Sequence, residues 1–128
     1  MRASTVLAIS SGINSAITPS VAKKLPYDTL KDFAAIGLVG NGAYVLVVHP
    51  GVQAKSISEF VALAKAKPDS IGYGTIGAGS LAHLAMTALG NFHNISWVHV
   101  PYKGGGPLST DGVAGHVPVT IATYALWA

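Results

Sequence analysis

The chain has 128 residues, of which half are hydrophobic and only a tenth are charged, with a formal net charge of +3. This length suffices for one domain with a hydrophobic core. The basic residues are scattered rather than interleaved with aromatic residues, which argues against nucleic-acid binding. No window approaches the roughly 18 apolar residues of a membrane-spanning helix, and a mildly basic protein suits small anionic ligands. The absence of cysteine excludes disulfides and thiolate metal sites.

The first ten residues carry one positive charge and a short apolar run that serine interrupts, which makes a poor secretory signal. We instead expect a buried strand at residues 5–9. The small polar residues Ser10, Ser11 and Gly12 should form a turn after it. Pro19 can begin a short helix, because proline is tolerated in a first helical turn.

Two runs predicted as strands, residues 34–39 and 43–49, lie on either side of a Gly-Asn-Gly turn. The second run is apolar throughout, as expected for a strand that is buried on both faces. A helix should begin at Ser56, because Ser56 and Glu59 have the spacing of a capping box, and Pro68 should end it.

Residues 71–85 contain the strongest functional signal. They pass from a short strand through a glycine-rich turn into a helix that Ser80 can cap. One apolar face of this helix is predicted from residues at helical spacing: Leu81, Leu84, Ala85 and Ala88. Free N–H groups and the positive end of the helix dipole favour a carboxylate or phosphate, which glycines allow to approach the backbone. An ordinary strand-to-helix turn is the alternative.

A strand at residues 96–100, a helix at residues 108–114 closed by Gly115, and a final strand from residue 117 to about 121 complete the pattern. Pro118 would remove a backbone donor from that strand, which indicates an edge position or a bulge. Alternating strands and helices indicate an α/β fold with a mostly parallel sheet, in which ligands gather at the carboxyl ends of strands. Three loops of small residues take that position, at residues 10–12, 75–80 and 103–106.

Signatures along most of the chain resemble those of Bug-type receptors, the extracytoplasmic solute receptors of tripartite tricarboxylate transporters. The matching stretches are residues 24–28 (Lys-Leu-Pro-Tyr-Asp), 31–33, 45–50, 54–56, 63–68, Tyr73 with Gly77, Gly79 and residues 83–85, residues 98–104 (Val-His-Val-Pro-Tyr-Lys-Gly), residues 110–111, and Gly115 with Val117. The resemblance implies a two-lobed, periplasmic-binding-protein-like fold that closes over a small carboxylated solute without catalysis or a cofactor. It also implies a periplasmic location and membrane transporter subunits as partners.

The resemblance further implies which residues contact the ligand. These are Ser10, Ser11 and Gly12 in the first loop, Gly77, Gly79 and Ser80 in the second, and Tyr102 and Lys103 in the third. A whole family member is more than twice as long. The chain therefore resembles a second lobe at residues 41–128, with a remnant of the first lobe and the crossover at residues 1–40. Because one such chain cannot form a complete two-lobed site, we expect a homo-oligomer.

The five histidines do not predict a metal site, because they show no H-x-H or H-E-x-x-H spacing and no neighbouring carboxylate cluster. His83 lies in the first helical turn after Ser80, where the helix dipole disfavours a protonated ring. We expect a neutral His83 that donates one hydrogen bond inside the fold.

Two other functions fit parts of the sequence. Residues 78–82 resemble a serine elbow, and Asp111 and His116 could complete a hydrolase triad with Ser80. Alternatively, the chain is a receptor-lobe fragment that serves only in assembly or has no remaining ligand function.

Overall fold

The computed structural model describes Ala8, residues 17–21 and residues 24–128. Contacts within the chain divide it into two compact units, Met1–Gly37 and Leu38–Ala128. The predicted strand at residues 5–9 and the loop of Ser10, Ser11 and Gly12 lie outside the described residues. The assignment of residues 1–40 and 41–128 to two lobes stays a prediction.

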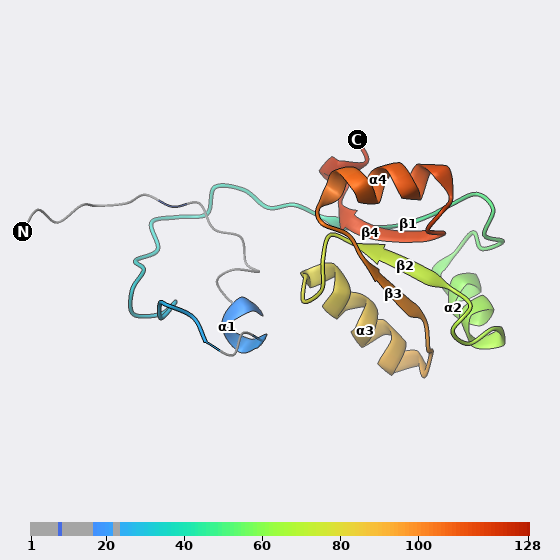
Figure 1. Ribbon diagram of the computed structural model, residues 1–128, viewed down its shortest axis with the longest axis horizontal. Coiled ribbons are helices and arrows are strands. Elements are labelled where there is room, and N and C mark those ends of the chain that lie inside the picture. Colours follow the sequence, from blue (N-terminus) through green and yellow to red (C-terminus); the bar gives the residue numbers. More distant parts are fainter. Residues whose placement is uncertain (1–7, 9–16, 22–23) are drawn as a thin grey trace, which may run out of the picture. The chain divides into compact units, whose positions relative to one another are not determined.

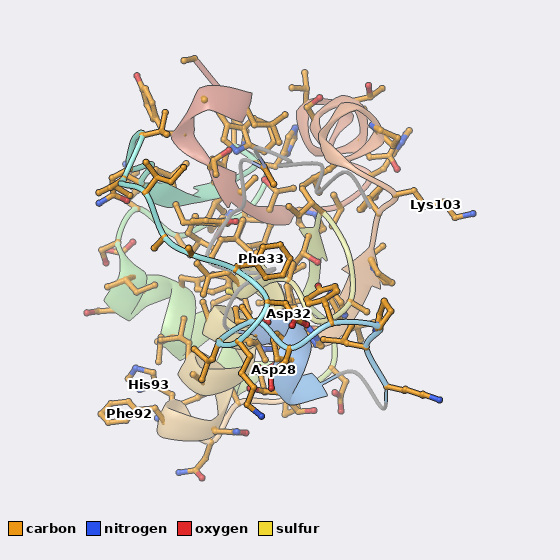
Figure 2. The ribbon with its side chains drawn as sticks, turned by 90° about the vertical axis from the view of Figure 1, so that its left-hand side faces the viewer. Asp28, Asp32, Phe33, Phe92, His93 and Lys103 are labelled. Atoms are coloured by element: carbon orange, nitrogen blue, oxygen red, sulfur yellow. The ribbon has the colours of Figure 1, made fainter. Side chains whose placement is uncertain are left out.

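The described part of the first unit is a short helix followed by turns and irregular chain. Helix α1 (Thr18–Val21) is a single turn. The Asp28 carboxylate accepts hydrogen bonds from the N–H groups of Leu30 and Lys31, at 3.0 and 3.3 Å, which closes a local turn. Figure 2 shows Asp28, Asp32 and Phe33 along this segment.

The strand predicted at residues 34–39 is absent, because the segment has no partner strand within the described residues. The side chains of Ile36 and Leu38 are 86% and 87% exposed. Sequence propensity alone cannot form a strand, since a strand needs backbone partners.

The second unit is built on a four-stranded sheet in the order β1 (Tyr44–Val48), β4 (Val119–Thr123), β2 (Gly72–Thr75), β3 (Val98–Pro101). β2 is parallel to β3 and β4, whereas β1 is antiparallel to β4. In Figure 1, α4 (Gly105–Ala114) lies on one side of the sheet and α2 (Ile57–Ala66) and α3 (Leu81–His93) lie on the other. A short 3-10 helix, η2 (Tyr124–Leu126), follows β4. This architecture confirms the predicted α/β fold with a mostly parallel sheet.

Two strand predictions need correction. β1 is an edge strand that is half-buried at every position, not a strand buried on both faces. Pro118 does not mark an edge or a bulge, because β4 is a central strand that begins after it. The Pro118 carbonyl accepts a hydrogen bond from His49 N at 2.9 Å, and the proline, which has no N–H, cannot return that bond.

The main hydrophobic core lies between one face of the sheet and helices α2 and α3. Its buried members are Phe60, Ala64, Ile71, Tyr73, Ala82, Met86, Val119 and Ile121. Trp97 stacks on Phe60 with ring centroids 5.7 Å apart. Full burial of a side chain the size of Phe60 or Met86 stabilises the fold by about 1.5–3 kcal/mol, so these two anchor their helices.

Helix α3 buries a different face from the apolar face that its sequence presents. Ala82, Met86 and Gly90 are buried, whereas Leu81 and Leu84 are 42% and 38% exposed. A side chain at Gly90 would place its Cβ 3.1 Å from Trp97 Nε1, a tight contact that glycine avoids. The buried face of α3 is the one that the sheet meets.

On the opposite face of the sheet, Gly74 allows helix α4 to pack directly against β2. A Cβ at Gly74 would lie 2.6 Å from Leu108 Cδ1 and 3.1 Å from the Tyr102 ring. Gly115 ends α4 in the left-handed conformation at φ 77°, as predicted. None of the helices in the described residues is long and apolar enough to cross a membrane.

The predicted capping box of α2 is only partly formed. Ser56 Oγ accepts a hydrogen bond from Glu59 N at 3.2 Å, as expected. The Glu59 carboxylate, however, accepts from Lys55 N at 2.7 Å instead of from Ser56 N. The reciprocal bond is displaced by one residue.

Candidate functional site

The link from β2 to α3 forms a sharp corner at residues 77–80, at the carboxyl end of a parallel strand. Gly77 and Gly79 have φ values of 152° and 74°. The value at Gly79 is one that residues with a side chain rarely adopt. A Cβ at Gly79 would meet no atom within 4 Å, so the space beside its backbone is open. We refer to this region as the 77–80 corner.

The N–H groups of the three predicted ligand residues in this corner already have acceptors. Gly77 N donates to Thr75 Oγ1 at 3.3 Å, and Ser80 N donates to the Gly77 carbonyl at 3.3 Å. Gly79 N donates to His83 Nδ1 at 3.1 Å. An anion that used these donors would have to displace a protein acceptor.

Other donors of the same corner remain available. In the described part of the chain, no acceptor is bound by the N–H groups of Ala78 and Leu81. Ser80 caps α3 as predicted, because its Oγ accepts from His83 N at 3.2 Å. Its hydroxyl hydrogen stays free to donate to a ligand. Sequence reasoning had named the glycines and overlooked Ala78, which lies between two residues of positive φ.

The Gly79 hydrogen bond determines the protonation state of His83. A backbone N–H can only donate, so His83 Nδ1 must accept and carries no proton. The ring is therefore neutral, as predicted. It accepts this hydrogen bond, however, where the sequence analysis expected it to donate one.

The His83 ring stacks on the ring of His99 from β3, with centroids 3.9 Å apart and planes 8° from parallel. His99 Nε2 lies 2.8 Å from Thr75 Oγ1, whose hydroxyl donates to the Gly77 carbonyl at 3.0 Å. With that donation, His99 Nε2–H is the donor to Thr75. Burial lowers the pKa of His99, and the nearby His83 ring lowers it further. Both rings thus support the corner in their neutral forms.

Sequence reasoning missed this pair, because the pairing of β2 with β3 brings His99 into place. His99 lies directly opposite Tyr73 in the parallel pairing of β2 and β3, and their rings are 5.0 Å apart. Because alternate strand residues share a face, Thr75 lies on the same side of the sheet as Tyr73. Burial raises the pKa of Tyr73, whose hydroxyl interacts with Thr87 of α3.

The third predicted loop adjoins the corner through its backbone. Tyr102 N donates to the Thr75 carbonyl at 2.9 Å, yet the Tyr102 hydroxyl donates to Asp111 Oδ2 at 2.8 Å. Burial and the Asp111 carboxylate raise the pKa of Tyr102, while the Tyr102 and His116 hydrogen bonds lower the pKa of Asp111. The side chain of Lys103 extends away from the ribbon (Figure 2). The structure therefore brings the backbone of this loop to the corner but directs both side chains elsewhere.

The geometry gives no support to a serine hydrolase. Asp111 and His116 do meet, with His116 Nδ1 3.3 Å from Asp111 Oδ1. However, Val119 lies opposite Tyr73 in the parallel pairing of β4 and β2, so His116 lies at the amino ends of these strands. Ser80 instead follows the carboxyl end of β2, so it lies at the opposite end of the strands from His116. The three residues do not form a triad.

The described surface also has hollows away from the corner. Two open hollows lie beside β1 and the start of α2, lined among others by Val48, Ala54 and Lys55. We give the corner more weight, because its donors and strand-end position are typical of ligand sites in parallel sheets. Among the described residues, no group of three or more histidine or acidic side chains could hold a metal ion.

Comparison with known proteins identifies the relatives of the chain. The profile of the tripartite tricarboxylate transporter family receptor (TctC) matches residues 3–128. Protein BugT of Bordetella pertussis is 32% identical over 118 residues, which cover 91% of this chain and 36% of BugT. A solved periplasmic transporter superimposes with a TM-score of 0.82 at 32% identity, over 89% of this chain and 38% of that one. The structure of R. palustris Rpa4515 with adipate gives a TM-score of 0.74 at 25% identity, over 81% and 35% of the two chains. The chain thus spans little more than a third of the length of these relatives.

Proposed function

This chain belongs to the tripartite tricarboxylate transporter family of receptors, and from that premise we propose that it binds a small carboxylated solute at the 77–80 corner. One observation carries the assignment to this corner. The Ser80 hydroxyl and the N–H groups of Ala78 and Leu81 remain available there, at the start of a helix. A relative of similar fold, Rpa4515, is described with adipate, a dicarboxylate.

The electrostatics of the corner suit a carboxylate. The first turn of α3 contains no acidic residue, so no carboxylate of that turn competes for the helix start. Each charge-assisted hydrogen bond contributes about 1.5–3 kcal/mol where water is excluded. Since this corner offers few donors on its own, we expect weak binding, on the order of millimolar.

Further contacts to the ligand are proposed outside the 77–80 corner. We propose that Ser10, Ser11 and Gly12, which lie outside the described residues, supply further contacts, together with the backbone of Tyr102 and Lys103. We also propose a periplasmic location and membrane transporter subunits as partners, which the family supports.

An NMR titration with adipate, succinate or nicotinate tests the site. We expect the amide resonances of Ala78, Gly79, Leu81 and Ala82 to shift in a saturable manner. Shifts that gather elsewhere, for example in the hollow beside β1, would reject the corner. Gly42→Val is the control variant and should keep the adipate response, because a Cβ there meets no atom within 4 Å.

We also propose that the chain self-associates through an apolar surface of the second unit. The exposed side chains of α3 include Leu84 and Phe92, at 38% and 81%, and Val98 on the edge strand β3 is 48% exposed. Exposed apolar surface and an unpaired strand edge both drive association. Sedimentation velocity at tens of micromolar, roughly the range in which such surfaces associate, should show a dimer or larger species that Phe92→Glu reduces. Self-association without any carboxylate response would favour the assembly-fragment interpretation.

A further inference from the structure

The His83 ring binds a backbone N–H group that the proposed ligand would also use. Its Nδ1 accepts the N–H of Gly79, 3.1 Å away, at the residue where the backbone is most open to approach. His83 also donates its own backbone N–H to Ser80 Oγ, 3.2 Å away. A ligand held at the 77–80 corner therefore lies close to both the backbone and the ring of His83.

The neutral ring of His83 disfavours a bound anion in this geometry. Nδ1 presents a lone pair toward the corner and removes the Gly79 N–H from use. A proton on Nδ1 would reverse both effects. The ring would become a cationic donor, and the Gly79 N–H could no longer donate to it and would turn to another acceptor.

We propose that His83 is itself a ligand of the bound carboxylate: its ring takes up one proton from solvent at Nδ1, releases the Gly79 N–H, and both groups then donate to the carboxylate. The inference rests on the proposed function of the same corner. The proton balance is one proton bound for each carboxylate engaged, with no covalent bond formed or broken. A carboxylate has two acceptor oxygens, so it can satisfy both donors at once.

The interactions of the described residues give the His83 ring no carboxylate partner within the fold. His99 from β3 stacks directly on it, and two charged rings at 3.9 Å would repel each other. Tyr73 from β2 lies next to His99, and α3 has no acidic residue in its first turn. The two ion pairs of the described residues join Asp28 to Lys31 and Asp111 to His116, so neither places a carboxylate on His83.

The stacked partner makes His83 the ring that takes the proton. Burial already disfavours charge on His99, and its Nε2–H is bound to the hydroxyl of Thr75, a fully buried side chain. His83 instead lies at the open corner beside the ligand. The helix dipole opposes a cation there, but a bound carboxylate reverses that balance.

The test is an NMR titration of the 128-residue chain with adipate at pH 6, 7 and 8, where adipate stays ionised because carboxyl pKa values lie near 4. We expect roughly tenfold tighter binding at pH 6 than at pH 8, the range in which histidine side chains change charge. The 15N resonance of His83 Nδ1 should move from the unprotonated to the protonated position on saturation. This second readout needs no variant.

His83→Asn is the decisive variant, because the asparagine Oδ1 can accept the Gly79 N–H but cannot take up a proton. Its adipate affinity should change less than about twofold over the same pH range. His93→Asn, at the other end of α3 (Figure 2), is the matched control and should keep the full pH dependence.

The outcomes separate the two proposals. Adipate binding with no pH dependence, or with one that survives in His83→Asn, or with Nδ1 unprotonated at saturation, overturns the role of His83 and leaves the proposed function standing. The absence of any adipate response at all three pH values overturns both.

Discussion

Helices α3 and α4 begin at equivalent places, at the carboxyl ends of the neighbouring parallel strands β2 and β3, yet their first turns differ. The start of α3 is capped by Ser80 and joined by hydrogen bonds to Thr75 and His83. The start of α4 has Gly104 at its N-cap, with φ 110° and no side-chain cap. Two helix starts in similar positions therefore differ in their side-chain hydrogen bonds.

The difference shows that a helix start is not an anion site merely because its N–H groups lack intrahelical partners. At α3 the neutral acceptors Thr75 and His83 bind some of these groups and fix the shape of the corner. A carboxylate gains only what it adds beyond those bonds. Helix α4 is instead held from its middle, where Asp111 binds Tyr102, and its first turn is left without a side-chain cap.

The largest effect on the comparison should come from Gly79→Val, which breaks the α3 corner. A β-branched side chain at φ 74° is strained, and such strain costs about 1–3 kcal/mol. We expect the free energy of unfolding in urea to fall by that amount and the adipate response to disappear. Gly42→Val, which adds the same side chain in open space, should change neither. A wild-type adipate response in Gly79→Val would contradict the prediction.

Ser80→Ala removes the cap that distinguishes α3 from α4. Loss of an N-cap hydrogen bond should lower the free energy of unfolding by about 1 kcal/mol. The adipate affinity should weaken several-fold, because one hydroxyl donor is lost. Ser58→Ala, at an exposed position in the first turn of α2, is the matched control for urea denaturation. Equal stability of the two variants would show that the cap contributes nothing.

Tyr102→Phe tests whether α4 is held through its middle. The hydroxyl bond to Asp111 is partly exposed, so its loss should cost slightly less than the cap, about 0.5–1 kcal/mol. Tyr124→Phe, which alters an exposed tyrosine after β4, should leave the free energy of unfolding unchanged. The amide resonances of the 77–80 corner should move little in either variant. Large shifts at the corner would mean that the two helix starts are coupled.

The smallest expected effect is a decrease in the free energy of unfolding at acidic pH. The pKa of His99 is lower in the folded protein than its usual value near 6.5, so below that pH the unfolded chain binds the proton more readily. The free energy of unfolding should therefore decrease as the pH falls from 7 to 5. Asp111 does not contribute in this window, because its lowered pKa moves its loss of stability below pH 3.8. His99→Gln should flatten the urea midpoint between pH 7 and 5, and an unchanged slope would contradict the assignment.

The local signals in the sequence predicted much of the second unit. The caps at Ser80 and Gly115 were placed correctly, because capping depends on residues within one helical turn. The strand and helix order followed from hydrophobic spacing, and the family followed from motifs in their correct order. The corner at the end of β2 was located for the same reason, although the partners of its N–H groups were not.

What the sequence by itself determined is therefore local: the helix ends, the glycine corner and the alternation of strands and helices. Tertiary packing decided that α3 buries Ala82 and Met86 instead of Leu81 and Leu84, because the sheet meets that face of the helix. It also decided that residues 34–39 form no strand and that β4 lies inside the sheet, since strand partners come from distant parts of the chain. Tertiary structure also decided the stacking of His83 on His99, because β3 brings one ring to the other only when the sheet has formed.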